Sequence, residues 1–172
     1  MIRPAQAGDA KAIADFWNPQ IRETMITFSS VEKTPEEIAL MIDHRPIFLV
    51  AELEGQVVGF ATYRQFRGGI GYARTMEHTV ILAPSARQRG LGRALMREIE
   101  AHAKAAGAHT MIAGVSSGNQ DARAFHAALG YDYVVILPEV GQKFEKWWDL
   151  VLMQKFLSPR VSEGADIGNS SG

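Results

Sequence analysis

Apolar residues at helical spacing alternate along the chain with short runs rich in β-branched and aromatic residues. Spacings of three and four residues predict helices, and runs bounded by glycine, proline or polar turns predict strands. Four helices are predicted. The first is capped by Asp9 and carries the apolar residues Ile13, Phe16, Trp17 and Ile21. The second extends from Pro35 to near Arg45, and the last two cover 91–106 and 119–129. The predicted strands are 2–4, 47–53, 57–66, 72–82, 109–115, 131–137 and 147–156.

This mixture predicts an α/β fold with a central mixed sheet, mostly antiparallel, and helices on both faces. No internal repeat is visible, and the length favours a single domain, which we place at residues 1–157. Residues 158–172 are small, polar and glycine-rich. We expect them to form a disordered tail.

The composition excludes several classes of function. The chain has 172 residues, a formal net charge of −1 and no cysteine. A nearly neutral chain has no overall field that attracts nucleic acid or an acidic membrane, so any anion site must be local. The lack of cysteine excludes disulfides and thiolate metal sites, and the five histidines are too scattered for a metal site. No apolar run suits a signal peptide or a membrane span, so we expect a cytoplasmic protein with no metal, nucleic-acid partner or membrane partner.

The stretch SARQRGLGRALM, residues 85–96, places a glycine-rich turn between a strand and a helix. Unpaired backbone amides and the helix dipole make such a turn a phosphate site, and Gly90 and Gly92 let the backbone approach an anion closely. Three arginines add positive charge around it: Arg87, Arg89 and Arg93. A plain turn with surface arginines is the alternative. The sequence fits neither a P-loop, which needs Gly-Lys-Ser/Thr, nor the dinucleotide fingerprint, which needs a third glycine.

The spacing Gln88-Arg89-Gly90-Leu91-Gly92, after TVILAPSA, resembles the pyrophosphate loop of the GNAT acetyltransferase superfamily. The segment SGNQDARAFHAALGYDY resembles a further motif of that superfamily. The resemblance implies acetyl-CoA as co-substrate and a strand before the loop that is splayed from its neighbour. It implies a cofactor site made of Val80, Ile81, Leu82, Arg87, Gln88, Arg89, Gly90, Leu91, Gly92, Arg93 and Asn119, with His126 near the thioester sulfur.

MEHTVIL and VGQKFEKWWDLVLMQ resemble the phosphinothricin and methionine-sulfone N-acetyltransferase branch of that superfamily. The branch often has an arginine where Ala73 stands here, and Arg74 is displaced by one position. The resemblance implies a small zwitterionic amine as acceptor. Arg74, just upstream of Glu77, is the best-placed cation for its carboxylate, and we expect Thr75, Phe28 and Met25 to complete the acceptor site. Because Arg74 and Glu77 point to opposite faces of an ideal strand, this site needs a bulge or a strand that begins after Arg74.

Acetyl transfer to an amine requires the loss of a proton, and Glu77 is our candidate general base. The alternative is a glutamate on the solvent face of a sheet. His78 points to the opposite face, and we interpret it as structural. The resemblance implies that His126 protonates the leaving thiolate; a histidine on the helix surface is the equal alternative, and Tyr131 and Tyr133 are nearby in sequence.

Three functions fit these residues: an N-acetyltransferase of small amino acids, an N-acetyltransferase of protein N-termini or lysines, and a non-catalytic acyl-CoA-binding module. The presence of Glu77 favours an enzyme. We also expect a homodimer, because the last strand, 147–156, is long and apolar and would aggregate as an exposed edge. Three aromatic residues are expected in the core or at an interface: Phe144, Trp147 and Trp148. Lys143 is expected to be solvated.

Overall fold

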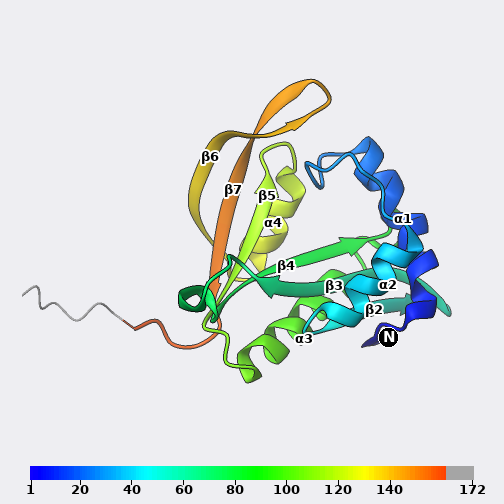
Figure 1. Cartoon of the computed structure of the whole chain (residues 1–172), viewed down its shortest axis with the longest axis horizontal. Helices are drawn as coiled ribbons and strands as arrows, with labels where there is room; N and C mark the ends of the chain where they lie inside the picture. Colours follow the sequence, from blue (N-terminus) through cyan, green and yellow to red (C-terminus); the bar gives the residue numbers. More distant parts are fainter. Residues whose placement is uncertain (162–172) are drawn as a thin grey trace, which may run out of the picture.

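Seven strands form one sheet, and helices cover both of its faces (Figure 1). The computed structural model describes residues 1–161. The strand order is β1-β2-β3-β4-β5-β7-β6, in which the β4–β5 pair is parallel and the other five pairs are antiparallel. The strands are β1 (Ile2–Pro4), β2 (Phe48–Leu53), β3 (Gln56–Gln65), β4 (Thr75–Leu82), β5 (Thr110–Ser116), β6 (Asp132–Lys143) and β7 (Lys146–Phe156). The helices are α1 (Ala10–Glu23), α2 (Pro35–His44), α3 (Leu91–Ala105) and α4 (Gln120–Ala128), with short 3-10 turns at Ala7–Asp9, Ile70–Tyr72 and Pro84–Ala86.

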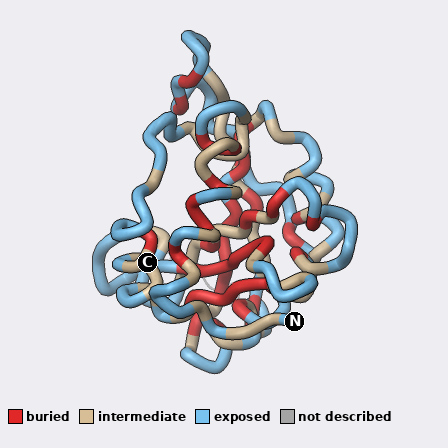
Figure 2. The backbone as a smooth tube through the Cα atoms, turned by 90° about the vertical axis from the view of Figure 1, so that its right-hand side faces the viewer, coloured by how far each residue is buried: buried red, intermediate tan, exposed pale blue. Residues whose placement is uncertain are grey.

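Two apolar cores lie on opposite faces of the sheet, and the buried backbone runs through the middle of the molecule (Figure 2). On one face, α1 and α2 pack on Phe60 and Ile81. On the other face, α3 packs through Leu95 and Ile99, and Val80 lies against that core. Because successive side chains of a strand alternate between faces, β4 contributes to both cores. The predicted fold class is therefore confirmed.

Most of the predicted helix and strand boundaries agree with the structure, with three differences. Asp9 stands at the start of α1, but its carboxylate accepts from the Arg3 guanidinium and the Gln6 amide instead of capping the helix. Strand β4 begins at Thr75 rather than at residue 72, because the chain before it forms a 3-10 turn. Strands β6 and β7 extend toward each other through residues 138–146 and meet in a tight turn.

The prediction that the last strand is an exposed edge is wrong. Strand β7 pairs with β5 on one side and with β6 on the other, so β6 is the edge strand at this end of the sheet and β1 is the edge strand at the other end. None of the helices in residues 1–161 is long and apolar enough to span a membrane. Of the predicted tail, residues 162–172 lie outside the described residues.

Candidate active site

Strands β4 and β5 separate halfway along their length. They pair only from Thr75 to Glu77 on β4, opposite Thr110 to Ile112 on β5, whereas β4 remains paired with β3 up to Leu82. Beyond Glu77, the edge of β4 that faces β5 therefore has backbone groups outside the ladder. Unpaired backbone groups need a partner, and an extended ligand arm can supply one. This splay is the feature that the superfamily resemblance implies.

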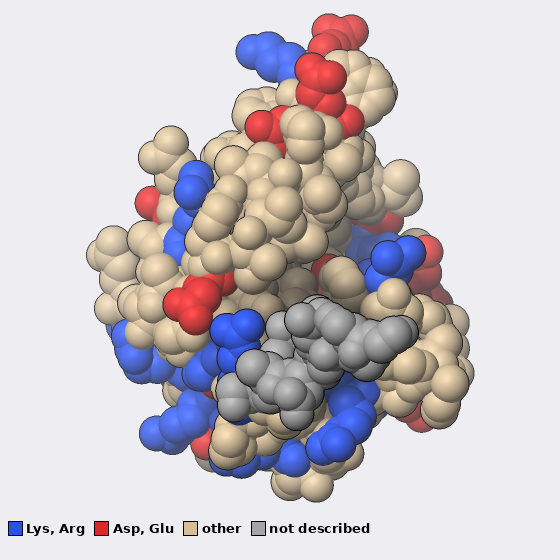
Figure 3. All heavy atoms as spheres, turned by 90° about the vertical axis from the view of Figure 1, so that its left-hand side faces the viewer, with Lys and Arg blue, Asp and Glu red and all other residues tan. Residues whose placement is uncertain are grey.

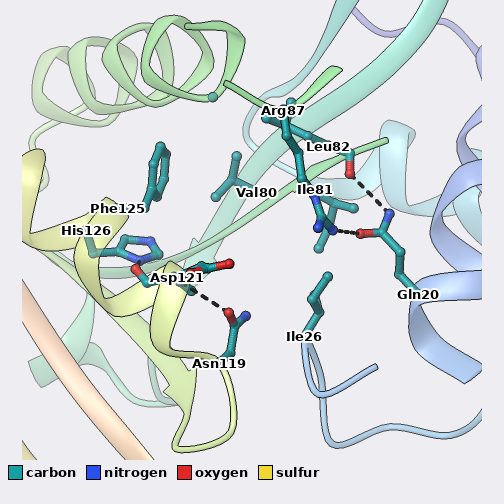
Figure 4. A pocket seen from close by; sticks show the side chains of 12 residues that line it. Gln20, Ile26, Val80, Ile81, Leu82, Arg87, Asn119, Asp121, Phe125 and His126 are labelled. Atoms are coloured by element: carbon teal, nitrogen blue, oxygen red, sulfur yellow. Dashed lines mark hydrogen bonds between the residues drawn. The ribbon is translucent and has the colours of Figure 1, made fainter. Parts of the chain in front are cut away.

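A cavity of about 230 Å³ lies in this splay, between the end of β4 and α4 (Figure 4). Its walls combine apolar side chains with a few polar ones. The lining residues are Gln20, Ile26, Val80, Ile81, Leu82, Arg87, Gly92, Asn119, Asp121, Ala122, Phe125 and His126. Seven of the expected cofactor and catalytic residues are thus brought to one cavity: Val80, Ile81, Leu82, Arg87, Gly92, Asn119 and His126.

The glycine-rich turn has the backbone shape that an anion site needs. Gln88 and Gly90 both have positive φ angles, 60° and 75°, and Gly90 stands at the start of α3 with no side chain capping the helix. The first amides of α3 are therefore free to meet a phosphate. Gly92 also has a packing role, because a Cβ there would lie 3.2 Å from the Phe125 ring and 3.3 Å from Leu82.

Gln20 links helix α1 to this turn. Its side-chain nitrogen donates to the carbonyls of Phe16, at 2.7 Å, and Leu82, at 3.2 Å. Its side-chain oxygen accepts from the Arg87 guanidinium at 2.8 Å (Figure 4). Gln20 therefore orients Arg87 toward the cavity, a role that sequence reasoning missed because the two residues are 67 positions apart.

A second cavity, of about 390 Å³, opens on the α1–α2 side of the splay. It shares Ile26, Val80, Ile81, Asn119, Ala122 and His126 with the first cavity. Its other lining residues are Trp17, Thr27, Phe28, Lys33, Met41, Arg45, Arg64, Glu77, His78, Thr79, Gly114, Val115, Ser116 and Leu150. Two ligands could therefore meet where the two cavities join.

Glu77 lies on the wall of this second cavity, where a general base can reach an acceptor. Its carboxylate is about one quarter exposed and accepts from the Arg64 guanidinium at 3.3 Å, directly across the β3–β4 pair. Gly114 on β5 leaves room beside it, because a Cβ there would lie 3.3 Å from a Glu77 carboxylate oxygen. Nothing local in the sequence marks Gly114 as part of a site.

His126 is buried between the two cavities and stacks on His78 with ring centroids 4.9 Å apart. Its Nδ1 lies 2.6 Å from the Ala122 carbonyl, so Nδ1 carries the proton and Nε2 has a lone pair. Burial lowers the pKa of His126, so the ring is neutral at pH 7. It must therefore take up a proton before it can give one to a thiolate.

The rings of His78 and Tyr131 lie against the His126 ring. His78 is buried and lines part of the second cavity, and its burial and the neighbouring His126 lower its pKa. The Tyr131 hydroxyl donates to the Glu100 carboxylate on α3, and burial raises the pKa of Tyr131. Tyr133 is half exposed on β6 and lines neither of the two cavities.

Arg74 does not lie at this site, which corrects our expectation. Its guanidinium donates to the Gly107 carbonyl at 2.8 Å, in the turn after α3. Thr75, at the start of β4, lines neither cavity. Of the expected acceptor residues, Phe28 lines the second cavity. Met25 packs against Gly118 and is not among the residues that line the second cavity.

Lys143 was expected to be solvated, but the structure buries it. Its ammonium donates to three backbone carbonyls, those of Ile21 and Thr24 at 2.6 Å and of Thr27 at 2.8 Å. These carbonyls lie at the end of α1 and in the following loop, where a cation also complements the helix dipole. Lys143 thus attaches the β6–β7 hairpin to the loop that lines both cavities.

Residues 13–131 match the Acetyltransferase (GNAT) family. The chain belongs to the GNAT acetyltransferase family. It is 32% identical over 168 residues to the L-amino acid N-acyltransferase MnaT of Escherichia coli, covering 95% of this chain and 98% of that protein. It is 33% identical over 169 residues to an L-methionine sulfoximine/L-methionine sulfone acetyltransferase of Pseudomonas paraeruginosa, covering 94% and 96%. A phosphinothricin N-acetyltransferase of Streptomyces coelicolor is 32% identical over 161 residues, covering 90% and 94%.

Solved structures of acetyltransferases superpose closely on this GNAT enzyme. One is yncA of Salmonella typhimurium with its cofactor acetyl-CoA, with a TM-score of 0.88, 30% identity and coverage of 96% and 98%. Another is a ribosomal-protein-alanine N-acetyltransferase of Brucella melitensis, with a TM-score of 0.87, 35% identity and coverage of 91% and 99%. The chain is thus an acyltransferase of the GNAT fold, and acetyl-CoA is the acyl donor of this family.

Proposed function

We propose that this enzyme transfers acetyl from acetyl-CoA directly to the α-amine of a small amino acid of the methionine sulfone, methionine sulfoximine or phosphinothricin kind. The observation that carries the proposal is the splay between β4 and β5, where Glu77 faces a cavity that joins the cofactor cavity. The named relatives support this substrate class, because one is named for L-amino acids in general and two are named for methionine sulfoximine and methionine sulfone or for phosphinothricin.

In this proposal the chain itself supplies the cofactor contacts. The free amides of residues 88–93 bind the pyrophosphate, and Arg87, held by Gln20, adds charge. The unpaired edge of β4 from Val80 to Leu82 binds the extended arm of acetyl-CoA, and Asn119 closes the opposite wall. The residues present therefore fit the co-substrate.

Glu77 accepts a proton from the amine, directly or through a water, as the amine attacks the thioester carbon. An unpaired backbone amide near Ile81 stabilises the negative oxygen that forms. The carbon–sulfur bond then breaks, and the thiolate takes up a proton. His126 is the donor in this proposal: its Nε2 takes the second proton, which the nitrogen loses as the amide forms, and gives it to the thiolate, while the proton on Glu77 returns to solvent. The reaction needs no metal, nucleic acid or membrane, and we place it in the cytoplasm, where acetyl-CoA is available.

Acetylation of a protein N-terminus is the second candidate, since the chain also superposes on a ribosomal-protein-alanine N-acetyltransferase. A non-catalytic acyl-CoA-binding module is a third. Both are tested by the experiment that tests the first candidate.

We expect acetyl-CoA to raise the melting temperature of the protein, because a ligand that binds only the folded state stabilises it. We then expect thiol release when methionine sulfone, methionine sulfoximine or phosphinothricin is added. Stabilisation without turnover of any amine would support the binding module. Turnover of peptides but not of free amino acids would support the second candidate.

We also propose a homodimer, formed by β6 rather than by the last strand. The outer part of β6 exposes five aliphatic residues: Val134, Val135, Ile136, Leu137 and Val140. Figure 3, which views the molecule from this side, shows a wide uncharged area over the upper half. Trp147 and Phe144 are also exposed, which favours an interface over the core. An exposed apolar edge of this kind is covered in most proteins.

Light scattering at micromolar concentration should therefore give twice the mass of the chain. Ile136→Lys should give the monomer mass, because a charge on the edge opposes strand association. Val161→Lys, at an exposed position outside the sheet, is the matched control and should remain dimeric. A monomer from the unaltered protein would contradict the proposal.

A further inference from the structure

The second cavity carries more positive than negative charge. Among the described residues that line it, Lys33, Arg45 and Arg64 are cations, and Glu77 is the carboxylate. A cavity with surplus cations favours an anionic ligand. The proposed acceptor is zwitterionic, so the surplus charge raises the question of which arginine meets its carboxylate.

Arg64 lies beside Glu77 with most of its donors unused. The two residues are direct partners in the β3–β4 register, and one guanidinium nitrogen lies 3.3 Å from the carboxylate. A guanidinium has five N–H donors, so Arg64 can bind a second carboxylate without leaving the first.

Arg45 follows the end of α2 and lines the same cavity as these two side chains. Burial lowers its pKa, Arg64 lowers it further, and Glu77 raises it. Among residues 1–161 its guanidinium makes no hydrogen bond or ion pair, although it is half-buried. Two guanidinium groups thus line the same cavity as Glu77, and a bound anion would relieve their mutual repulsion.

The covalent structure of an α-amino acid sets a strict condition on its site. Its amine and its carboxylate are attached to one carbon, so the base that serves the amine and the cation that binds the carboxylate must be neighbours. Arg64 and Glu77 meet this condition, whereas Arg74 is bound to the turn after α3. A peptide N-terminus carries a neutral amide in place of that carboxylate, so it cannot form a charge-paired, bidentate contact with the arginines.

We propose that Arg64 and Arg45 bind the carboxylate of the acceptor and thereby make the enzyme specific for free α-amino acids over peptide N-termini. This inference rests on the proposed function, since it assigns the acceptor part of that same site. Once bound there, the carboxylate shares Arg64 with Glu77 and fixes the amine beside the base.

The test compares three acceptors that share one side chain: methionine sulfone, its carboxamide, and the corresponding amine without the carboxyl group. Arg64→Gln should raise KM for methionine sulfone about 10- to 100-fold, the usual effect of losing a charge-assisted hydrogen bond. It should leave KM for the other two acceptors unchanged. Arg45→Gln should also raise KM for methionine sulfone. Arg64→Lys should give a KM between those of the unaltered enzyme and Arg64→Gln, because lysine keeps the positive charge but cannot bind a carboxylate with two parallel hydrogen bonds.

Arg97→Gln is the matched control, because Arg97 is exposed on α3 and lines neither cavity. Acetyl-CoA affinity, measured by calorimetry, should be the same in all variants, and circular dichroism checks that each one folds. Equal KM changes for all three acceptors, or a selective change in Arg74→Gln instead, would overturn the assignment. If the unaltered enzyme turns over no free amino acid at all, the proposed function itself fails.

Discussion

Glu77→Gln should lower kcat about 10²- to 10⁴-fold at neutral pH, the usual contribution of a general base. Glutamine has the size of glutamate and can still accept from Arg64, so the wall of the cavity should persist. What is lost is the ability to take a proton from the ammonium form of the acceptor. Steady-state kinetics with saturating acetyl-CoA measures the loss, and calorimetry should show unchanged acetyl-CoA affinity.

The difference in kcat between Glu77→Gln and the unaltered enzyme should become smaller as the pH rises, because a growing share of the acceptor amine is already deprotonated and needs no base. Glu98→Gln, an exposed position on α3, is the control and should keep full activity. A variant at position 77 that retains the activity of the unaltered enzyme at pH 7 would assign deprotonation to solvent or to another group.

The fold and the cofactor loop could be predicted because their signals are local. Gly90, Gly107 and Gly130 each adopt a positive φ at a helix end, where few other residues fit. The alternation of apolar residues in β4 places Glu77 and Ile81 on one face and His78 and Val80 on the other. Such patterns depend only on neighbours in the chain, so they can be interpreted without a structure.

The residues proposed to bind the acceptor could not be predicted in the same way, because their arrangement depends on contacts between segments that are far apart in the chain. Arg64 reaches Glu77 only through the register of β3 on β4, and the sequence favoured Arg74 because it is only three positions from Glu77 in the chain. Strand order is likewise non-local, which is why β7 was mistaken for an edge. The role of Lys143 depends on carbonyls 116 to 122 positions away.

Lys143→Met should lower the free energy of unfolding by about 2–4 kcal/mol. Methionine fills nearly the same volume as the lysine stem but cannot donate hydrogen bonds, so packing is kept while three buried or partly buried carbonyls lose their donor. Hydrogen bonds to a charged group contribute about 1.5–3 kcal/mol each, and the cost of burying the ammonium offsets part of that sum. Urea unfolding followed by circular dichroism measures the change.

The same substitution should raise KM for the acceptor, because Ile26, Thr27 and Phe28 line the second cavity and their loop is attached to the hairpin through Lys143. Phe28 packs so closely on Gly141 that a Cβ there would lie 2.5 Å from its ring, so the loop and the hairpin form one unit. Lys146→Met is the matched control on the same hairpin, since Lys146 is exposed, and it should change stability by less than about 0.5 kcal/mol. If Lys143→Met unfolds at the same urea concentration as Lys146→Met, the three carbonyl contacts do not hold the loop, and its position must depend on the contact between Phe28 and Gly141.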